Sequence, residues 1–306
     1  MRAWRQATPS DPALRATPVA LALCESCGTA RSLGRVPEPD AHETSYYAPT
    51  RGAADRIVEP LRRLADRDRL RSLPTLQAGE RVLEIGSGDG RFLAAARERG
   101  GSVVGIEPSA EARARAARLG IESYAGGVED ARVPPRSVGA VIAWHSLEHL
   151  DSPFDALRLA RAWLKPGGAL VVAVPNRASL QARIGGDRWF HQDVPRHRTH
   201  FTSAGARAIV QRSGFEVKRV RHLLVEQNPL GMWQTLLNRL THERDVAYRA
   251  IKRDPTVRGS SGDLLVSALA GPPLVPIAIG LELLAGVLRR GGSIVVEARA
   301  VGDEPS

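Results

Sequence analysis

The sequence predicts an α/β protein built on a doubly wound, mostly parallel, seven-stranded sheet with helices on both faces. Short apolar runs alternate with helical stretches from residue 81 to residue 174, at the spacing of strand–helix–strand units. Glycines follow the first apolar run and end several of the helical stretches. Sheets of this kind bind ligands at the carboxyl ends of their strands, so we expect the functional residues in the loops that follow the strands.

Each predicted strand is a short run rich in Val, Ile, Leu or Ala. Helices are predicted between the strands, and turn or capping residues mark their ends. Pro153 suits the first turn of one helix and Thr202 suits the N-cap of another. The seven predicted strands cover residues 81–85, 102–107, 121–125, 139–144, 169–174, 215–225 and 293–301. The predicted helices cover the stretch after Pro60 and residues 90–99, 110–119, 153–164 and 203–213.

We expect four segments along the chain. Residues 1–50 are expected to form an N-terminal arm, because prolines recur there without helical or strand periodicity. The core covers residues 51–225, and a helical apolar insertion covers residues 226–292. Residues 293–306 supply the last strand of the core and a tail.

The N-terminal arm holds the only two cysteines, Cys24 and Cys27, at CxxC spacing. Residues 1–11 carry no apolar signal-peptide core, so we expect a reducing, cytoplasmic location and a pair of free thiols. A closed zinc site needs four ligands, and the sequence has no second CxxC. The sequence therefore predicts no metal site at this pair.

The chain is strongly basic, with 43 Lys and Arg against 33 Asp and Glu and a formal net charge of +10. Such a charge can indicate a nucleic-acid partner. However, the arginine-rich stretch 51–71 also holds Asp55, Glu59, Asp66 and Asp68. Mixed signs on one helix are typical of a solvated face, so nucleic acid is not favoured as the partner.

A glycine-rich turn, Glu84–Gly90, joins the first predicted strand of the sheet to its helix. Glycines there allow the backbone to approach a ligand closely, and a helix N-terminus favours an anionic group. Glu107 ends the second strand about 20 residues further on, where a carboxylate can accept both hydroxyls of a ribose. Its alternative role is a negative charge at the start of the next helix, since Pro108 and Ser109 follow it. Ribose binding is favoured, because position and spacing agree.

Four segments together resemble class I S-adenosylmethionine-dependent methyltransferases, in the branch near the ubiquinone-biosynthesis-like small-molecule enzymes. Their order and spacing match over about residues 80–225. The four segments are Val82–Gly90, Val104–Pro108, Trp144–Leu150 and Leu164–Leu170. The resemblance implies a Rossmann-like fold, S-adenosylmethionine as cofactor and methyl transfer as the reaction.

The resemblance also implies roles for individual residues. Gly86 and Gly88 would lie against the methionine portion of the cofactor, Glu84 would help hold its amino group, and Glu107 would bind its ribose. The family often carries an acidic residue where Gly127 stands, so the adenine contact falls here to the backbone or to Glu129. The complete set of implied cofactor contacts is Glu84, Gly86, Ser87, Gly88, Gly90, Glu107, Pro108, Val128, Glu129, Trp144 and His145.

The densest cluster of functional side chains is the histidine-rich loop, which we define as residues 189–201. It resembles a stretch of the same branch, placed after the fifth strand, where this fold admits the acceptor. His191, His197 and His200 are candidates for a catalytic base or for acceptor contacts. Two alternatives remain open: the loop is only pinned by hydrogen bonds, or it forms a metal site, and no metal ligand is assigned.

An uncharged stretch, Leu264–Leu281, is 18 residues long, which meets a crude length test for a membrane span. We expect Gly271–Pro273 and Pro276 to break any helix there, leaving residues 277–288 as a piece of about 18 Å, too short to span. The sequence thus predicts a paired-helix insertion. Residues 264–290 would form a lid, a homodimer contact or a peripheral membrane contact near Arg289 and Arg290.

The sequence as a whole predicts a methyltransferase that uses S-adenosylmethionine on a small-molecule or lipid- or glycan-linked acceptor. We expect it in the cytoplasm, with peripheral membrane contact as an open alternative. A second hypothesis is a non-catalytic nucleoside-binding protein of the same fold, whose loop and apolar insertion contact a partner. An NAD-dependent dehydrogenase shares the glycine turn but gives no reason for the segments after the fourth strand and before the fifth.

Overall fold

The computed structural model describes residues 1–9, 17–34, 53–73, 79–225, 227–252, 254, 257 and 261–302. The chain divides into two compact units, which are described separately. The first unit comprises Met1–Arg62, Pro175–Ser203 and Arg221–Ile294, and the second comprises Arg63–Val174, Ala204–Val220 and Val295–Ser306.

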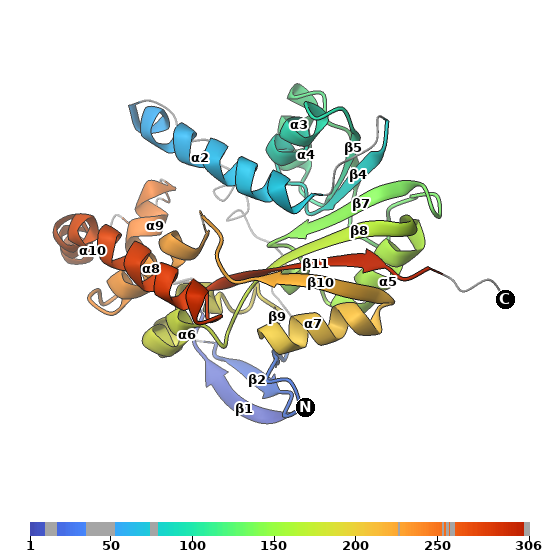
Figure 1. Cartoon of the computed structure of the whole chain (residues 1–306). Helices are drawn as coiled ribbons and strands as arrows, with labels where there is room; N and C mark the ends of the chain where they lie inside the picture. Colours follow the sequence, from blue (N-terminus) through green and yellow to red (C-terminus); the bar gives the residue numbers. More distant parts are fainter. Residues whose placement is uncertain are drawn as a thin grey trace. The chain divides into compact units, whose positions relative to one another are not determined.

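The second unit contains the predicted seven-stranded sheet, in the order β10-β11-β8-β7-β4-β5-β6 (Figure 1). The pairs from β8 to β6 are all parallel, which confirms the mostly parallel, Rossmann-like prediction. The strands are β4 (Arg81–Ile85), β5 (Ser102–Glu107), β6 (Ser123–Ala125), β7 (Val138–Trp144), β8 (Leu164–Pro175), β10 (Phe215–Arg221) and β11 (Ser293–Ala300).

Helices pack around this sheet through their apolar faces. The helix α5, for example, buries Leu157, Ala160 and Trp163, and the Ser152 hydroxyl at its N-cap accepts a hydrogen bond from the Asp155 amide. The helices that contribute to this unit are α2 (Ala53–Ser72), α3 (Arg91–Arg97), α4 (Ala110–Arg118), α5 (Pro153–Trp163) and α7 (Ser203–Arg212). The predicted helices 90–99, 110–119, 153–164 and 203–213 are confirmed to within a few residues, whereas α2 begins at Ala53, so Pro60 lies within the helix instead of at its first turn.

The strand β8 begins earlier than predicted, at Leu164 instead of residue 169. Leu164 pairs with Val138, and the register between β7 and β8 shifts between Val138 and Ala140. Such a bulge accommodates extra residues within a strand pair. Residues 165–168, expected to form the turn that ends α5, therefore lie inside the strand.

The first unit contains a four-stranded antiparallel sheet in the order β1-β2-β3-β9. Its strands are β1 (Arg2–Ala7), β2 (Val19–Leu23), β3 (Ala30–Ser32) and β9 (Thr199–His200). The expectation of an irregular arm is wrong for the first three of these stretches. They are too short to show periodicity, and β3 is paired with a strand about 170 residues away, since Ala30 lies opposite His200.

The remaining helices of the first unit pack against one another. They are α6 (Leu180–Gly185), α8 (Gln227–Asn238), α9 (Val246–Ile251) and α10 (Ser261–Val287), with short 3-10 turns at Gly186–Arg188 and Phe190–Gln192. Helix α10 runs unbroken through Pro272, Pro273 and Pro276, so the expected break is wrong. Proline removes a hydrogen-bond donor but fixes a helical φ. Helix α10 also packs against α8. Next to the prolines, Trp233 Nε1 of α8 donates a hydrogen bond to the Gly271 carbonyl of α10 at 2.9 Å.

Candidate active site

The carboxyl ends of three neighbouring strands meet in the second unit. Ile85 at the end of β4 pairs with Ile106 of β5 on one side and with Ala143 of β7 on the other. The amides of Gly86 and Ser87 both donate to the Ile106 carbonyl, at 2.8 and 3.1 Å. The parallel register therefore gathers the loops that follow β4, β5 and β7 at one edge of the sheet, as the sequence predicts.

The glycine turn adopts a backbone that side chains rarely allow. Gly86, Gly88 and Gly90 have φ values of 73°, 54° and 74°, in the left-handed region. A Cβ on Gly86 would lie 2.6 Å from the Cβ of Ser146, whose hydroxyl donates to the Ile85 carbonyl at 2.7 Å. Any larger residue at position 86 would therefore push apart the ends of β4 and β7.

The Glu107 carboxylate, only 2% exposed, bridges the glycine turn and the start of α4. Its Oε2 accepts a hydrogen bond from the Gly88 amide at 2.8 Å, and its Oε1 accepts one from the Ser109 amide at 2.9 Å. The Ser109 contact is the helix-start role that the sequence left as the alternative. The Gly88 contact places the same carboxylate against the glycine turn, where ribose binding requires it. The two roles are therefore compatible.

At this edge of the sheet, the buried atoms Glu84 Oε2 and Trp144 Nε1 have no hydrogen-bond partner among the described residues. Burial raises the pKa of Glu84 to about 8, although the positive charge of Arg69 opposes the shift. The Arg69 guanidinium also lies 5.1 Å from the Trp144 ring centroid. Leaving such atoms unpaired is costly, so the site favours a ligand with a cationic donor and an acceptor.

The loop that follows β6 carries the residues expected along the adenine. Val128 is buried, and Asp130 Oδ2 accepts a hydrogen bond from the Gly127 amide at 2.8 Å. A Cβ on Gly127 would lie 2.7 Å from the carboxyl carbon of Glu129. The missing side chain at position 127 thus leaves room for the Glu129 carboxylate, and the adenine contact of Glu129 stays a prediction.

His145 directly follows β7 with a left-handed φ of 51°, which is uncommon for a non-glycine residue. Its Nδ1 lies 3.2 Å from Glu148 Oε1, and its amide donates to the Ala173 carbonyl at 2.9 Å. Sequence reasoning missed Arg69 and Ser146, which complete this edge. Ser146 directly follows His145 at the end of a predicted strand, so its position could have indicated it. Arg69 lies within a helix of mixed charge, and no feature of the sequence distinguishes it from the other arginines there.

A family model described as a methyltransferase domain matches residues 57–220, more than half of the chain. The chain belongs to the methyltransferase-domain family. A ubiquinone biosynthesis O-methyltransferase of Pseudomonas aeruginosa (strain LESB58) is 31% identical over 185 residues, covering 56% of this chain and 77% of the relative. A tRNA U34 carboxymethyltransferase of Methylococcus capsulatus is 32% identical over 155 residues, covering 42% of this chain and 45% of that protein.

Solved structures confirm the fold of this methyltransferase. A geranyl diphosphate methyltransferase in complex with SAM has a TM-score of 0.53 at 16% identity, covering 85% of this chain and 95% of that one. The 4+2 cyclase SpnF has a TM-score of 0.52 at 21% identity, with 79% and 81% covered. The family match and the ubiquinone biosynthesis relative show a methyltransferase dependent on S-adenosylmethionine, and the glycine turn, Glu84 and Glu107 fit that cofactor.

The histidine-rich loop lies in the first unit, and all three candidate histidines are buried. His197 Nδ1 lies 2.9 Å from the His191 carbonyl oxygen, and His200 Nε2 lies 3.1 Å from the Ser32 hydroxyl. Burial, with the charge of His197 as the next contribution, lowers the pKa of His200 to about 3. A residue that weakly basic is a poor base near neutral pH, so His200 supports the structural alternative and leaves His191 and His197 as candidates.

The raised pKa of Glu84 predicts that cofactor binding releases a proton. The free protein holds Glu84 protonated below about pH 8, and a bound cationic amino group favours the carboxylate. The affinity for S-adenosylmethionine should therefore rise with pH up to about 8 and then level off. Calorimetry in two buffers of different ionisation enthalpy measures the released proton.

The matched variant for this prediction is Glu84→Gln, which keeps the shape but cannot titrate. It should bind more weakly and should lose the part of the proton release that belongs to Glu84. In the free protein, the folded-state pKa lies above the unfolded value, so Glu84 should lower stability as pH rises from about 4.5 to 8. Glu84→Gln should flatten that part of the melting-temperature profile, and identical profiles for the two proteins would contradict the assignment.

Proposed function

We propose that this methyltransferase acts in the cytoplasm on a small-molecule acceptor that is free or carried on a lipid or glycan. The relatives named ubiquinone biosynthesis O-methyltransferases support a small-molecule acceptor, since the chain covers 77% of the first of them. The exposed surface of α10 supports a lipid-linked acceptor. Its large apolar side chains are exposed to water, and such side chains favour contact with lipid.

The residues of the cofactor site and of the histidine-rich loop have distinct tasks in the proposed reaction. The cofactor supplies an electrophilic methyl group for an in-line displacement. Glu84 offers a buried acceptor to a cationic amino group, and Glu107 offers acceptors to ribose hydroxyls. If the acceptor is a hydroxyl group, a base must remove its proton, and His191 or His197 is proposed for that task.

A ligand panel tests the proposed function. S-adenosylmethionine and S-adenosylhomocysteine should raise the melting temperature, whereas NAD and NADP should not, because only ligands that bind the folded state stabilise it. Radiolabelled S-adenosylmethionine should then label hydroxylated small molecules or their lipid-linked forms. Binding without transfer to any acceptor would favour the non-catalytic alternative, and transfer to tRNA alone would contradict the acceptor class.

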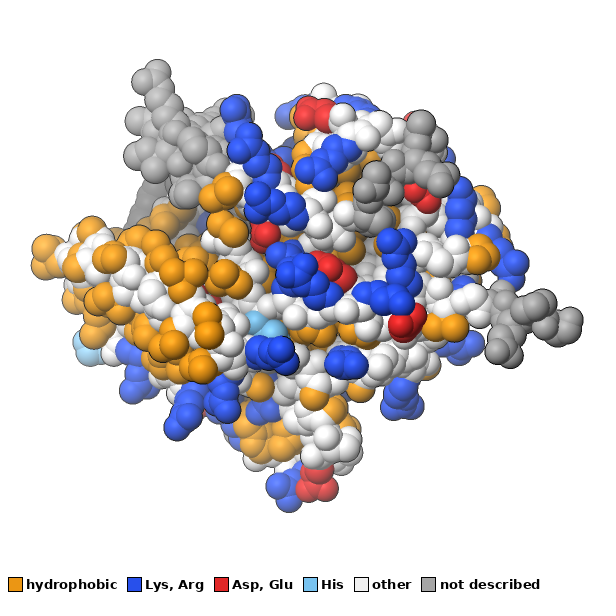
Figure 2. Space-filling view, in the orientation of Figure 1, with side chains coloured by type: hydrophobic (Ala, Val, Ile, Leu, Met, Phe, Trp, Pro, Cys, Tyr) orange, Lys and Arg blue, Asp and Glu red, His pale blue; other side chains and the backbone are white. Residues whose placement is uncertain are grey.

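We infer that α10 rests on the surface of an anionic membrane. The helix is apolar almost all round: its two charged side chains, Asp263 and Glu282, are buried, and large apolar side chains face outward. From residue 264 to residue 288, Ser267 and Glu282 are the only side chains that are neither apolar nor glycine, and both are buried. The outward face includes Leu269, 71% exposed, and Val287, 81% exposed. Figure 2 shows hydrophobic side chains gathered at its left, with Lys and Arg along the lower border.

The buried face of α10 is attached to the first unit at both ends of the helix. Asp263 accepts hydrogen bonds from the His242 and Glu243 amides at 2.9 and 2.7 Å. Glu282 accepts one from Gln181 Nε2 at 2.7 Å and one from the Gly292 amide at 3.2 Å. The 27 residues, about 40 Å long, exceed a bilayer core of about 30 Å, so the length argument against a span is wrong. These hydrogen bonds would have to break for α10 to span, which favours a position in the membrane plane.

Charge favours a lipid surface over a second copy of this chain as the covering partner. The formal net charge of +10 repels a second copy but attracts anionic lipid headgroups. Arg289 and Arg290 are exposed at the end of α10, next to its apolar face. Basic residues beside an exposed apolar helix favour binding to a surface of anionic lipid headgroups.

The double change Leu269→Asp with Val287→Asp should abolish binding to vesicles that contain phosphatidylglycerol, because two charges would enter the apolar region. Co-sedimentation measures this, and the melting temperature should stay unchanged because both side chains are exposed. Leu119→Asp, at an exposed position of the second unit, is the matched control and should bind like the natural chain.

Alkaline carbonate should release the natural protein from membranes. Retention would show a spanning helix, and dimers in sedimentation velocity without vesicle binding would show a second copy instead.

A further inference from the structure

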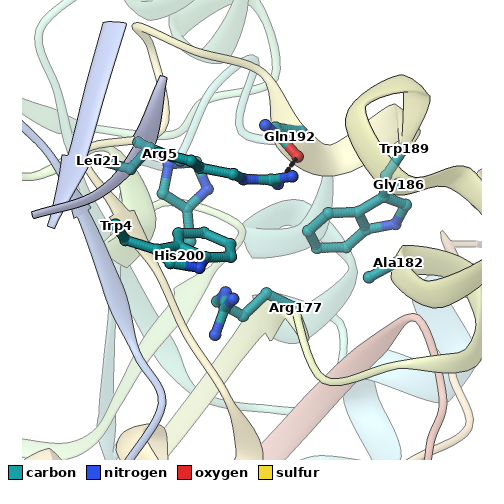
Figure 3. Close-up of a pocket in the computed structure, with 9 residues that line it drawn as sticks. All are labelled: Trp4, Arg5, Leu21, Arg177, Ala182, Gly186, Trp189, Gln192 and His200. Carbon is teal, nitrogen blue, oxygen red and sulfur yellow. Dashed lines mark hydrogen bonds between the residues drawn. The ribbon is translucent and has the colours of Figure 1, made fainter. Parts of the chain in front are cut away.

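A cavity of about 170 Å³ lies within the first unit, and none of its lining residues belongs to the glycine turn. Its lining comes from β1, from the segment that follows β8 and from the histidine-rich loop (Figure 3). Two tryptophans, Trp4 and Trp189, and two arginines, Arg5 and Arg177, face this cavity. None of the roles derived for the cofactor residues involves these side chains.

The two arginines are held close together by one aromatic ring. The guanidinium carbons of Arg5 and Arg177 each lie 4.3 Å from the ring centroid of Trp4. Cation–π contacts of this kind fix the planes of the guanidinium groups. Burial lowers the pKa of Arg177, and the nearby positive charge of Arg5 lowers it further. The two like charges therefore lie close together in a partly desolvated environment.

The positive charge at this cavity is not balanced within the described part of the first unit. Arg5 forms an ion pair with Asp187 and donates to Gln192 Oε1 at 2.7 Å. Arg177 donates to the Gly28 carbonyl, and no carboxylate among the described residues pairs with it. Among the described residues, therefore, only one of the two cations has a counter-charge.

Two hydrogen-bond donors of residues that line the cavity also have no acceptor among the described residues. Gln192 is only 4% exposed, and its Nε2 has no hydrogen-bond partner among the described residues. The same holds for Arg5 Nε. A buried donor without an acceptor is costly, so the lining favours a ligand that brings acceptor atoms and negative charge.

We propose that this cavity binds a phosphate group. Its donors come from separate parts of the chain, which suits a tetrahedral group with several oxygens better than a planar carboxylate. Arginine is well matched to phosphate through its planar fork of donors. The cavity is smaller than the roughly 300–1,000 Å³ of pockets that enclose whole drug-sized ligands, so it receives a headgroup while the rest of the molecule stays outside.

The test uses the full chain, with tryptophan fluorescence and calorimetry as the readouts and inorganic pyrophosphate and phenyl phosphate as probes. Both probes should bind the natural protein. Arg177→Met keeps the aliphatic stem beside Trp4 but removes the charge, so it should weaken binding on the order of 10- to 100-fold. Arg177→Lys keeps the charge without the fork and should recover part of the affinity.

Arg183→Met is the matched control, because it removes an equal charge from an exposed position of α6 outside the cavity. It should change phosphate affinity less than twofold. No binding at millimolar pyrophosphate, or equal losses in Arg177→Met and Arg183→Met, would overturn the proposal. Affinity for S-adenosylhomocysteine should be unchanged in all three variants, so failure of the phosphate site and failure of the proposed function give different results.

Vesicles distinguish the source of the phosphate. Phosphatidylcholine vesicles with and without phosphatidic acid are compared for the natural protein and for Arg177→Met. A loss of the phosphatidic acid dependence in Arg177→Met assigns the cavity to a lipid headgroup. Unchanged vesicle binding, together with weaker pyrophosphate binding, assigns it to a soluble phosphorylated molecule.

Discussion

Glu107→Ala should weaken binding of S-adenosylhomocysteine by about 1.5–3 kcal/mol, on the order of 10- to 150-fold. The change removes a nearly buried carboxylate that can accept hydrogen bonds from both ribose hydroxyls. It also removes the acceptor that holds the Gly88 amide at 2.8 Å, so the glycine turn loses part of its support. Calorimetric titration well below the melting temperature measures the effect.

Two variants separate cofactor binding from a general loss of structure. Glu107→Gln keeps one acceptor oxygen and should lose less affinity than Glu107→Ala. Glu111→Ala removes an equal charge from the surface of α4, where Glu111 pairs with Arg115, and should leave the affinity unchanged. If Glu107→Ala lowers only the melting temperature and not the affinity, Glu107 serves the start of α4 alone.

Replacing the catalytic base in the histidine-rich loop should lower turnover about 10²–10⁴-fold while cofactor affinity stays nearly constant. We expect this result for His191→Ala or His197→Ala, measured on a hydroxyl acceptor. The His197 imidazole contacts the backbone of residue 191, because its Nδ1 lies 2.9 Å from the His191 carbonyl oxygen. The variant with the selective loss of turnover identifies the base, and the other should show the smaller effect.

His200→Ala is the structural comparison for this pair. The burial that lowers the pKa of His200 to about 3 and its contact with the Ser32 hydroxyl predict a lower melting temperature without a selective loss of turnover. His242→Ala, at an exposed position of the same unit, should change neither quantity. If His191→Ala and His197→Ala also lower only the melting temperature, the loop is scaffolding and His145 becomes the next candidate.

The sequence by itself determined the sheet and the cofactor site, because both depend on local patterns. Apolar runs and glycine stops predict β4, β5, β7 and half of β8. In a parallel sheet, the ends of neighbouring strands meet at one edge. The glycine turn after β4, Glu107 and Trp144 are therefore predicted to converge, and the register of β4 with β5 and β7 brings these strand ends together.

Tertiary structure alone decided the features that depend on distant partners. The strand β3 is paired with β9 about 170 residues later in the chain, which no local period encodes. The phosphate cavity joins Trp4 to Trp189 for the same reason. Helix α10 continues through its prolines while packed against α8, and its outward apolar face became visible only once its buried side was known. Local propensity favours some conformations of a segment over others. Packing between distant segments then selects one of them, and this packing energy exists only in the folded chain.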